Sequence, residues 1–108
     1  MRYEVVMTLG AEQDLEEICD YIAERDAPAK AEHVLVQVDK VMTALAVSPA
    51  RGSYPRELLQ LGIREFRQTL FKPYRVVYRV IEQTVFVLLI ADARRDLQRV
   101  LEQRLLRS

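Results

Sequence analysis

The run of residues 84–91, Thr-Val-Phe-Val-Leu-Leu-Ile-Ala, constrains the fold of this chain more than any other segment. Apart from its first residue the run is apolar, so a strand formed by it would present apolar side chains on both faces. Such a strand must lie inside a sheet and be covered on both sides. The run is far shorter than the roughly 18 apolar residues that cross a bilayer, so we do not expect it to span a membrane.

Two segments before this run also have strand patterns, and both carry arginines. Residues 64–71 include Arg64-Glu65-Phe66-Arg67, and residues 74–82 include Tyr74-Arg75-Val76-Val77-Tyr78-Arg79-Val80. Lys72-Pro73 marks a turn between them, and residues 82–83 form a tight connection into the apolar run. Residues 3–9 predict one further, short strand. The sequence therefore predicts about four strands, three of them consecutive.

Helical periodicity dominates the segment between the first strand and residue 48. Apolar positions recur at helical spacing along two stretches, which Asp26-Ala27-Pro28 separates. We expect Thr8 to cap the first helix and Ser48-Pro49 to end the second. Two helices joined by so short a turn form an antiparallel hairpin.

The rest of the chain completes an α+β fold. Residues 48–62, which contain prolines and glycines, predict a loop, and residues 94–106 predict a final helix with Leu97, Leu101 and Leu105 on one face. The predicted architecture is an antiparallel sheet of about four strands with an N-terminal helical hairpin and a C-terminal helix, in the order β-α-α-β-β-β-α. We expect residues 1–108 to form a single domain, since a chain of this length can bury one core.

The charges of the chain are segregated, although its formal net charge is zero. Residues 1–39 hold ten acidic and three basic residues, and residues 40–108 hold six acidic and thirteen basic ones. Most of the basic residues are arginines, which suit bidentate contacts to carboxylates or phosphates. The acidic half argues against a protein coated for nonspecific binding to nucleic acid. The basic half permits a local anionic partner, unless the two halves neutralise each other across the fold.

Several classes of site are absent from the sequence. Cys19 is the only cysteine, which excludes an internal disulfide and a cysteine-based zinc motif. His33 is the only histidine and lies far in sequence from most of the arginines, and there is no glycine-rich phosphate loop. Asp14 and Glu17 are expected on a solvated helix face rather than as an acid–base pair. We expect no cofactor, no metal, no signal peptide and a cytoplasmic location.

The order of these motifs resembles the RelE/ParE superfamily of type II toxin–antitoxin toxins, and within it the ParE, or plasmid-stabilisation, branch. The resemblance is carried by the two arginine-bearing strands, the apolar run and the Ala93-Arg94-Arg95-Asp96 sequence after it. In the N-terminal half it is carried by Thr8 and by the Asp14-Leu15 and Tyr21-Ile22 pairs. It implies the fold just described and a toxin that is silenced by an antitoxin.

The resemblance also distinguishes two activities within the superfamily. RelE-type ribonucleases place basic residues on the sheet, a central arginine before the last helix and usually a tyrosine or histidine within that helix. Here Arg95 stands at the position of the arginine and Leu101 at that of the tyrosine, while Leu70 lies near the position of a second arginine. Asp92 stands where ParE-like chains often have histidine. We therefore assign no catalytic residue and expect an inhibitor of DNA gyrase.

Two alternatives remain open beside gyrase inhibition. One is a RelE-like, ribosome-dependent mRNA endonuclease with degenerate residues. The other is a non-toxic relative that only binds its antitoxin. The expected partners are a ParD-like antitoxin and gyrase, with DNA contacted only indirectly through the antitoxin complex and no membrane contact.

Basic and aromatic residues of the strands and of the last strand–helix junction are the candidates for contacts to the target or the antitoxin. Tyr74 either packs in a groove or stacks on a base. Arg94 and Arg95 either pair with Asp92 or Asp96, or contact an anion or a partner. The full candidate set is Arg64, Arg67, Tyr74, Arg75, Arg79, Arg94 and Arg95.

Overall fold

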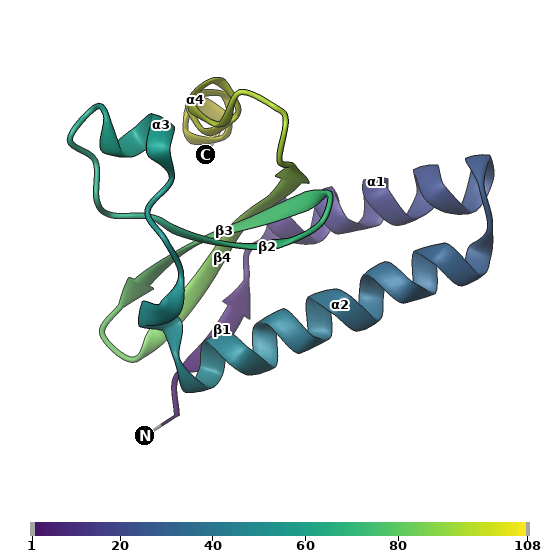
Figure 1. Cartoon of the computed structure of the whole chain (residues 1–108), viewed down its shortest axis with the longest axis horizontal. Helices are drawn as coiled ribbons and strands as arrows, with labels where there is room; N and C mark the ends of the chain where they lie inside the picture. Colours follow the sequence, from purple (N-terminus) through teal and green to yellow (C-terminus); the bar gives the residue numbers. More distant parts are fainter. Residues whose placement is uncertain (1, 108) are drawn as a thin grey trace.

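The chain folds into a four-stranded sheet with helices on both faces (Figure 1). This computed structural model describes the backbone of residues 2–107 and the side chains of residues 2–104. The elements are β1 (Glu4–Met7), α1 (Leu9–Arg25), α2 (Pro28–Val47), the 3-10 helix η1 (Pro49–Arg51), α3 (Arg56–Leu59), β2 (Arg67–Phe71), β3 (Tyr74–Ile81), β4 (Thr84–Asp92) and α4 (Leu97–Arg107). The predicted α+β class and element order are confirmed.

The sheet is mixed, which corrects the expectation of a wholly antiparallel one. Its strand order is β1-β4-β3-β2, with β1 parallel to β4 and the other two pairs antiparallel. Because α1 and α2 are antiparallel, α2 ends beside the start of β1, where the Tyr3 N–H donates to the Ala46 carbonyl at 2.8 Å. β2 therefore runs in the same direction as β1. Two hairpin turns reverse the chain twice, so β4 also runs in that direction and pairs with β1 in parallel.

The apolar run becomes β4, an interior strand with a neighbour on each side, as predicted. A bulge in the pairing of β4 with β3 changes which of its residues face each side of the sheet. Val77 pairs with Leu89 and Tyr78 with Val87, so Leu88 has no partner on β3. One extra residue reverses the alternation of side chains along a strand. As a result Val87 faces the helical hairpin, whereas Leu89 faces α4.

Two hydrophobic cores lie on opposite faces of the sheet. The hairpin core packs α1 and α2 on the sheet through buried residues Ala11, Val34, Val38, Leu45, Val76, Tyr78, Val85, Val87 and Ile90. The C-terminal core packs α3 and α4 on the other face through Leu58, Val77, Leu89, Ala91, Leu97 and Leu101. The apolar face expected for the last helix is confirmed at Leu97 and Leu101, while the side chain of Leu105 lies outside the described residues.

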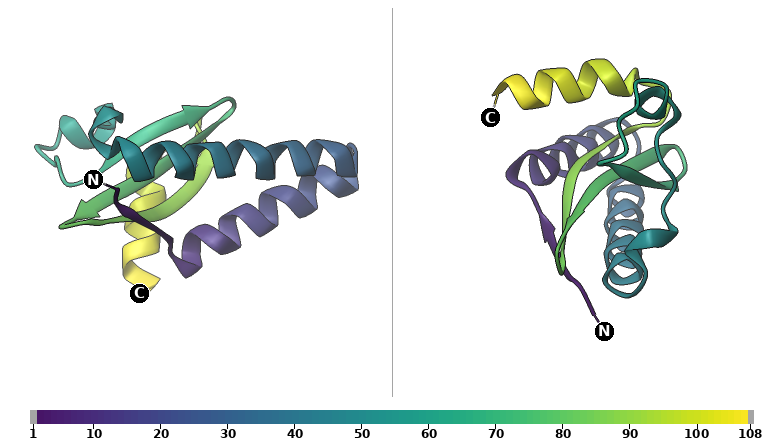
Figure 2. Two further views of the ribbon diagram at one scale, coloured as in Figure 1. Left: turned by 90° about the horizontal axis from the view of Figure 1, so that it is seen from below. Right: turned by 90° about the vertical axis from the view of Figure 1, so that its left-hand side faces the viewer.

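The helical hairpin has the predicted ends. The Thr8 side chain caps α1 by accepting the Ala11 N–H at 3.3 Å, and Pro28 is the first residue of α2. The tip of the hairpin extends past the sheet at one end (Figure 2). Among the described residues, no helix combines the length and apolar character needed to cross a membrane.

Several element bounds differ from the sequence-based expectation, and three of the differences are larger than one or two residues at a strand end. The segment 48–62, expected as a loop, contains α3, whose four residues are too few to show a helical period. Leu58 of α3 is only 3% exposed, so burial in the C-terminal core holds this short helix. The strand expected from residue 64 begins at Arg67, and the last helix begins at Leu97 after a turn that Asp96 terminates by accepting the Val100 N–H at its carbonyl.

Gly52 lies against the buried ring of Tyr78. The Tyr78 hydroxyl donates to the Pro49 carbonyl, and a Cβ at residue 52 would lie 2.0 Å from that hydroxyl oxygen and 2.8 Å from the Gln68 carbonyl oxygen. The Gln68 backbone is itself fixed by its bridge to Ser53. A side chain at residue 52 must therefore displace either the tyrosine or the edge of the sheet.

We expect Gly52→Ala to lower the free energy of unfolding by about 1–3 kcal/mol, the usual cost of overpacking. Urea or thermal unfolding measures this difference. The matched control is Ser53→Ala, since Ser53 is exposed and keeps its backbone bridge to Gln68. Equal stability of the two variants would contradict the described contact between residue 52 and Tyr78.

Candidate functional site

The buried guanidinium of Arg75 joins four separate segments of the chain. The Arg75 side chain is 7% exposed and forms an ion pair with Glu57 of α3, with an Nη2–Oε2 distance of 2.7 Å. Its Nη1 donates to the Gln68 side-chain oxygen of β2 at 3.0 Å. Its Nη2 also donates to two backbone carbonyls after β4, those of Ala93 at 3.2 Å and Arg95 at 3.0 Å.

These contacts satisfy a charge that would otherwise be costly to bury. A buried guanidinium is tolerated when a carboxylate and further acceptors surround it, and both conditions hold here. The hydrogen bond from Arg75 holds the pKa of Glu57 below its ordinary value, so Glu57 is ionised at neutral pH. Arg75 was predicted as a contact candidate, and the structure places it in the interior with both of its terminal nitrogens already engaged.

Arg94 lies at the surface and pairs with the last residue of β4. Its Nη2 is 2.8 Å from the Asp92 carboxylate, its Nε donates to the same carboxylate at 2.9 Å, and its side chain is 87% exposed. The hydrogen bond from Arg94 lowers the pKa of Asp92 to about 2. Of the two alternatives for Arg94, the structure therefore contains the ion pair with Asp92, on a side chain that stays open to solvent.

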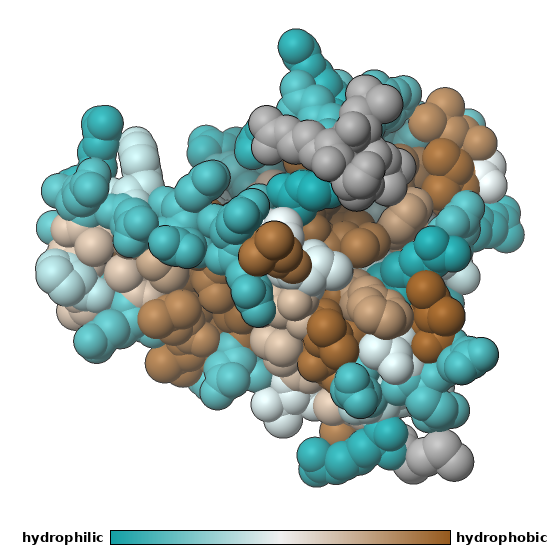
Figure 3. All heavy atoms as spheres, turned by 180° about the vertical axis from the view of Figure 1, so that it is seen from behind, coloured by the Kyte–Doolittle hydropathy of each residue, from teal (hydrophilic) through white to brown (hydrophobic). Residues whose placement is uncertain are grey.

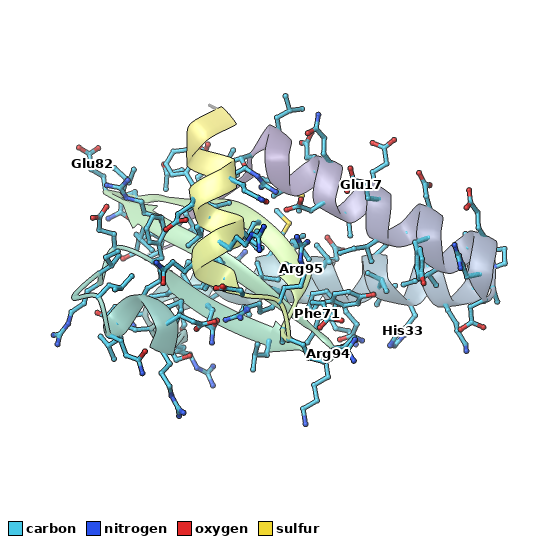
Figure 4. All side chains as sticks on the ribbon, turned by 90° about the horizontal axis from the view of Figure 1, so that it is seen from above. Glu17, His33, Phe71, Glu82, Arg94 and Arg95 are labelled. Atoms are coloured by element: carbon cyan, nitrogen blue, oxygen red, sulfur yellow. The ribbon has the colours of Figure 1, made fainter. Side chains whose placement is uncertain are left out.

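Arg95 is exposed and faces a cleft of about 440 Å³ between α1 and the end of β4. Three carboxylates line the same cleft, those of Asp14, Glu17 and Asp92. Figure 4 shows Arg95 in the turn just before α4, and Glu17 on α1. Asp14 pairs with Arg104 and Asp92 pairs with Arg94. Glu17 balances the charge of Arg95, so the cleft has no net positive charge that would attract a phosphodiester.

The proton-exchanging groups near Arg95 also differ from those of a ribonuclease. Tyr21 and Tyr74 line the cleft, and burial raises the pKa of Tyr74, which keeps it protonated at neutral pH. Leu101, at the position of the helix tyrosine, is buried in the C-terminal core. His33 is exposed on α2 and lines a different groove, beneath the β2–β3 turn. Histidine is therefore absent from the described surroundings of Arg95.

Asp14 fastens α1 to the edge of β4, which corrects the expectation that it lies on a solvated helix face. The Asp14 carboxylate accepts the Ile90 N–H at 3.0 Å, at a part of β4 that β1 does not reach, and it pairs with Arg104 at 2.7 Å. Arg104 in turn donates to the Leu88 carbonyl at 2.7 Å. These two side chains occupy backbone groups that a neighbouring strand would otherwise pair. Glu17 is exposed, as expected.

The remaining candidates do not converge on one site. Arg67 binds the backbone of the preceding loop, with Nη1 2.8 Å from the Gly52 carbonyl oxygen, and its guanidinium lies 4.3 Å from the ring centre of Tyr54. Arg79 is exposed and 3.6 Å from Glu65, and Arg64 is also exposed. Tyr74 is half-buried against Phe71.

Ion pairing does little to neutralise the two charged halves against each other. Of the five ion pairs within the described part of the chain, only that between Asp14 and Arg104 joins residues 1–39 to residues 40–108. The helical hairpin therefore keeps an acidic surface, and the sheet with α3 and α4 keeps a basic one. Among the described residues, no three His, Cys, Asp or Glu side chains gather as a metal site would require.

Sequence reasoning missed Glu57, Gln68 and Arg104 as partners. Glu57 lies in a stretch with no periodic pattern, and Gln68 and Arg104 resemble ordinary surface residues of a strand and a helix. A buried arginine requires a carboxylate nearby. An arginine within the apolar strand pattern 74–82 was therefore the one sequence signal that a carboxylate such as Glu57 had to lie beside it.

Comparison with known proteins gives one family and several similar structures. The sequence model described as "ParE toxin of type II toxin-antitoxin system, parDE" matches residues 5–97. A structure of a chromosomal ParDE toxin–antitoxin system from P. aeruginosa is 20% identical, with a TM-score of 0.69, covering 84% of this chain and 96% of that one. No curated protein matches the sequence.

Two further solved structures share the fold. The toxin–antitoxin complex RelBE2 from Mycobacterium tuberculosis is 22% identical, with a TM-score of 0.61, covering 85% of this chain and 99% of that one. A free E. coli RelE variant with two arginines replaced by alanine is 18% identical, with a TM-score of 0.63, covering 99% of this chain and 98% of that one.

The pair between Arg94 and Asp92 gives a pH prediction. We expect Arg94→Gln to raise the pKa of Asp92 from about 2 towards the ordinary value of about 3.9, since Arg94 is the main cause of the shift. A lowered folded-state pKa stabilises the fold above the unfolded-state pKa, and this contribution is lost as the pH falls towards about 2. Carboxyl ¹³C shifts of Asp92 followed through an acid titration measure the change.

The matched control is Arg95→Gln, because Arg95 makes only a minor contribution to this pKa. An Asp92 midpoint that is the same in the wild-type protein and in Arg94→Gln would show that the pair does not persist in solution.

Proposed function

The chain belongs to the ParE toxin family of type II toxin–antitoxin systems, and we propose that it acts by binding DNA gyrase and catalyses no reaction itself. The observation that carries the proposal is the cleft at Arg95, where three carboxylates leave no net positive charge to bind a phosphate. Cleavage of RNA needs cationic stabilisation of the transition state and a group that moves a proton from the ribose hydroxyl. Gyrase is the target that the ParE resemblance implies.

A ParD-like antitoxin is the proposed partner that silences the toxin. The similar P. aeruginosa structure is described as a ParDE system, which supports an antitoxin of this type. Apolar residues remain uncovered on the helical hairpin, where Leu35 is 48% and Val36 51% exposed. Figure 3 shows apolar patches separated by hydrophilic atoms on the face opposite to that of Figure 1. Patches of this kind suit an amphipathic helix or an extended segment of a partner.

The basic surface of the sheet suits an acidic segment of the same antitoxin. Arg64 and Arg79 are both exposed, and the ion-pair partner of Arg79, Glu65 at 3.6 Å, is exposed as well. We propose that the chain works in the cytoplasm and meets DNA only through the antitoxin complex.

Expression from the native operon should yield a complex with a small protein encoded beside the toxin. An interface that silences a toxin is expected to bury on the order of 1,500 Å² or more. Arg64→Glu combined with Arg79→Glu should weaken the complex, because both exposed charges then repel an acidic segment. The matched control is Arg25→Glu, which reverses an exposed charge on the acidic hairpin. Recovery of free toxin alone would contradict the partnership.

The target is tested with purified components. Gyrase should lose supercoiling activity and accumulate cleaved DNA when the toxin is added, while ribosomes with mRNA show no cleavage above background. We expect Arg95→Ala to weaken the inhibition about tenfold, as for an arginine at the centre of an interface. Its melting temperature should stay within a few degrees of wild type, because the Arg95 side chain is exposed.

The comparison variant is Leu101→Ala, which should lose about 2–4 kcal/mol of stability because Leu101 is buried. Below its melting temperature this variant should still inhibit gyrase. Codon-specific cuts in mRNA with unaffected gyrase would establish the endonuclease alternative. Absence of both activities would establish the non-toxic antitoxin-binding relative.

A further inference from the structure

We propose that Arg75 is a positioning residue, which from the interior fixes the turn that presents Arg94 and Arg95 to the target. The inference rests on the proposed function, because it assigns those two exposed arginines to a target contact. The turn consists of residues 93–96, between the end of β4 and the start of α4. The hydrogen bonds from Arg75 to this turn go to backbone carbonyls, so its proposed effect on the two exposed side chains runs through the backbone.

The carbonyls of Ala93 and Arg95 point to one atom. Nη2 of Arg75 donates to both, at 3.2 Å and 3.0 Å. Two carbonyls that lie two residues apart and share one donor fix the direction of the peptide groups between them. The side chains of Arg94 and Arg95 are both exposed, so the outer surface of the turn is left for a partner.

Backbone bonds complete the turn on its other side. The Ala93 N–H donates to the Pro73 carbonyl at 2.8 Å, and the Arg95 N–H donates to the Asp92 carbonyl at 3.0 Å. Arg75 is the second residue of β3 and lies two residues after Pro73, so the same short segment holds both sides of Ala93. No other described side chain donates a hydrogen bond to the carbonyls of Ala93 and Arg95.

The surroundings of Arg75 orient its guanidinium towards these carbonyls. Glu57 binds it in a bidentate manner, with oxygen distances of 2.7 Å and 3.3 Å, and Gln68 accepts from the same Nη1. A lysine can keep the charge opposite Glu57 but lacks the planar fork that reaches several acceptors at once. Glutamine at residue 57 keeps an acceptor oxygen for Arg75 and removes the charge. Arg75→Lys therefore removes the hydrogen bonds to the carbonyls of the turn, which we call the clamp, and keeps the charge. Glu57→Gln removes the ion pair and keeps the clamp.

Amide hydrogen exchange tests the clamp directly. In Arg75→Lys, exchange of the Ala93 and Arg95 amides should accelerate about tenfold or more, while amides in the middle of β3 and β4 keep their protection. In Glu57→Gln the same two amides should change by less than about threefold. Unchanged exchange of both amides in Arg75→Lys would overturn the proposal, whatever the activity of the protein.

Gyrase inhibition provides the functional arm of the test. Arg75→Lys should lose about tenfold in inhibition, and Glu57→Gln should lose much less, when both are assayed below their melting temperatures. The control for a change from arginine to lysine is Arg56→Lys, an exposed residue of α3. Loss of inhibition that follows melting temperature across all three variants would show a merely structural role and would overturn the proposal.

The test remains decisive if Arg75→Lys fails to fold or if the wild-type protein does not inhibit gyrase. If Arg75→Lys does not fold, the double variant Glu57→Gln with Arg75→Gln replaces it, since that pair leaves no buried charge unpaired. If the wild-type protein does not inhibit gyrase, the proposed function fails, and accelerated exchange with intact β3 and β4 still assigns the turn to Arg75.

Discussion

The ion pair between Arg75 and Glu57 organises the C-terminal face of this protein. It ties the short helix α3, the edge strand β2 and the turn before α4 to the start of β3, although these segments lie far apart in sequence. A four-residue helix has almost no intrinsic stability, because helix nucleation is unfavourable. Its position depends on Leu58 in the C-terminal core and on Glu57 at the guanidinium.

The charged side chains that line the cleft at Arg95 determine what this cleft can bind. The arginine lies at the position that the resemblance gives to a ribonuclease residue, yet Asp14, Glu17 and Asp92 line the cleft around it. Asp14 is also needed by the fold, because its carboxylate accepts the Ile90 N–H and pairs with Arg104. The fold therefore requires one of the carboxylates that cancel the positive charge at this cleft, and this charge balance supports a binding function for the surface.

Local patterns predicted the three long helices, the strands and the family, because each of these depends on neighbours in sequence. The apolar run correctly indicated an interior strand, and Thr8 and Pro28 correctly marked helix starts. The parallel pairing of β1, the bulge at Leu88 and the contacts of Asp14 were not predicted. They depend on where distant segments meet, and an aspartate on an acidic helix looks the same whether it faces solvent or a strand edge. The interior position of Arg75 was missed because its partner Glu57 lies in a segment without a period.

The most direct test of the central claim, that this member of the ParE family is an active toxin, is growth after induction of the chain alone and together with the gene beside it. Growth arrest on induction alone, relieved by co-expression of the neighbouring gene and weakened in Arg95→Ala at unchanged protein level, is the result that we predict. Normal growth with the folded protein present at full level would contradict the claim and leave antitoxin binding as the function.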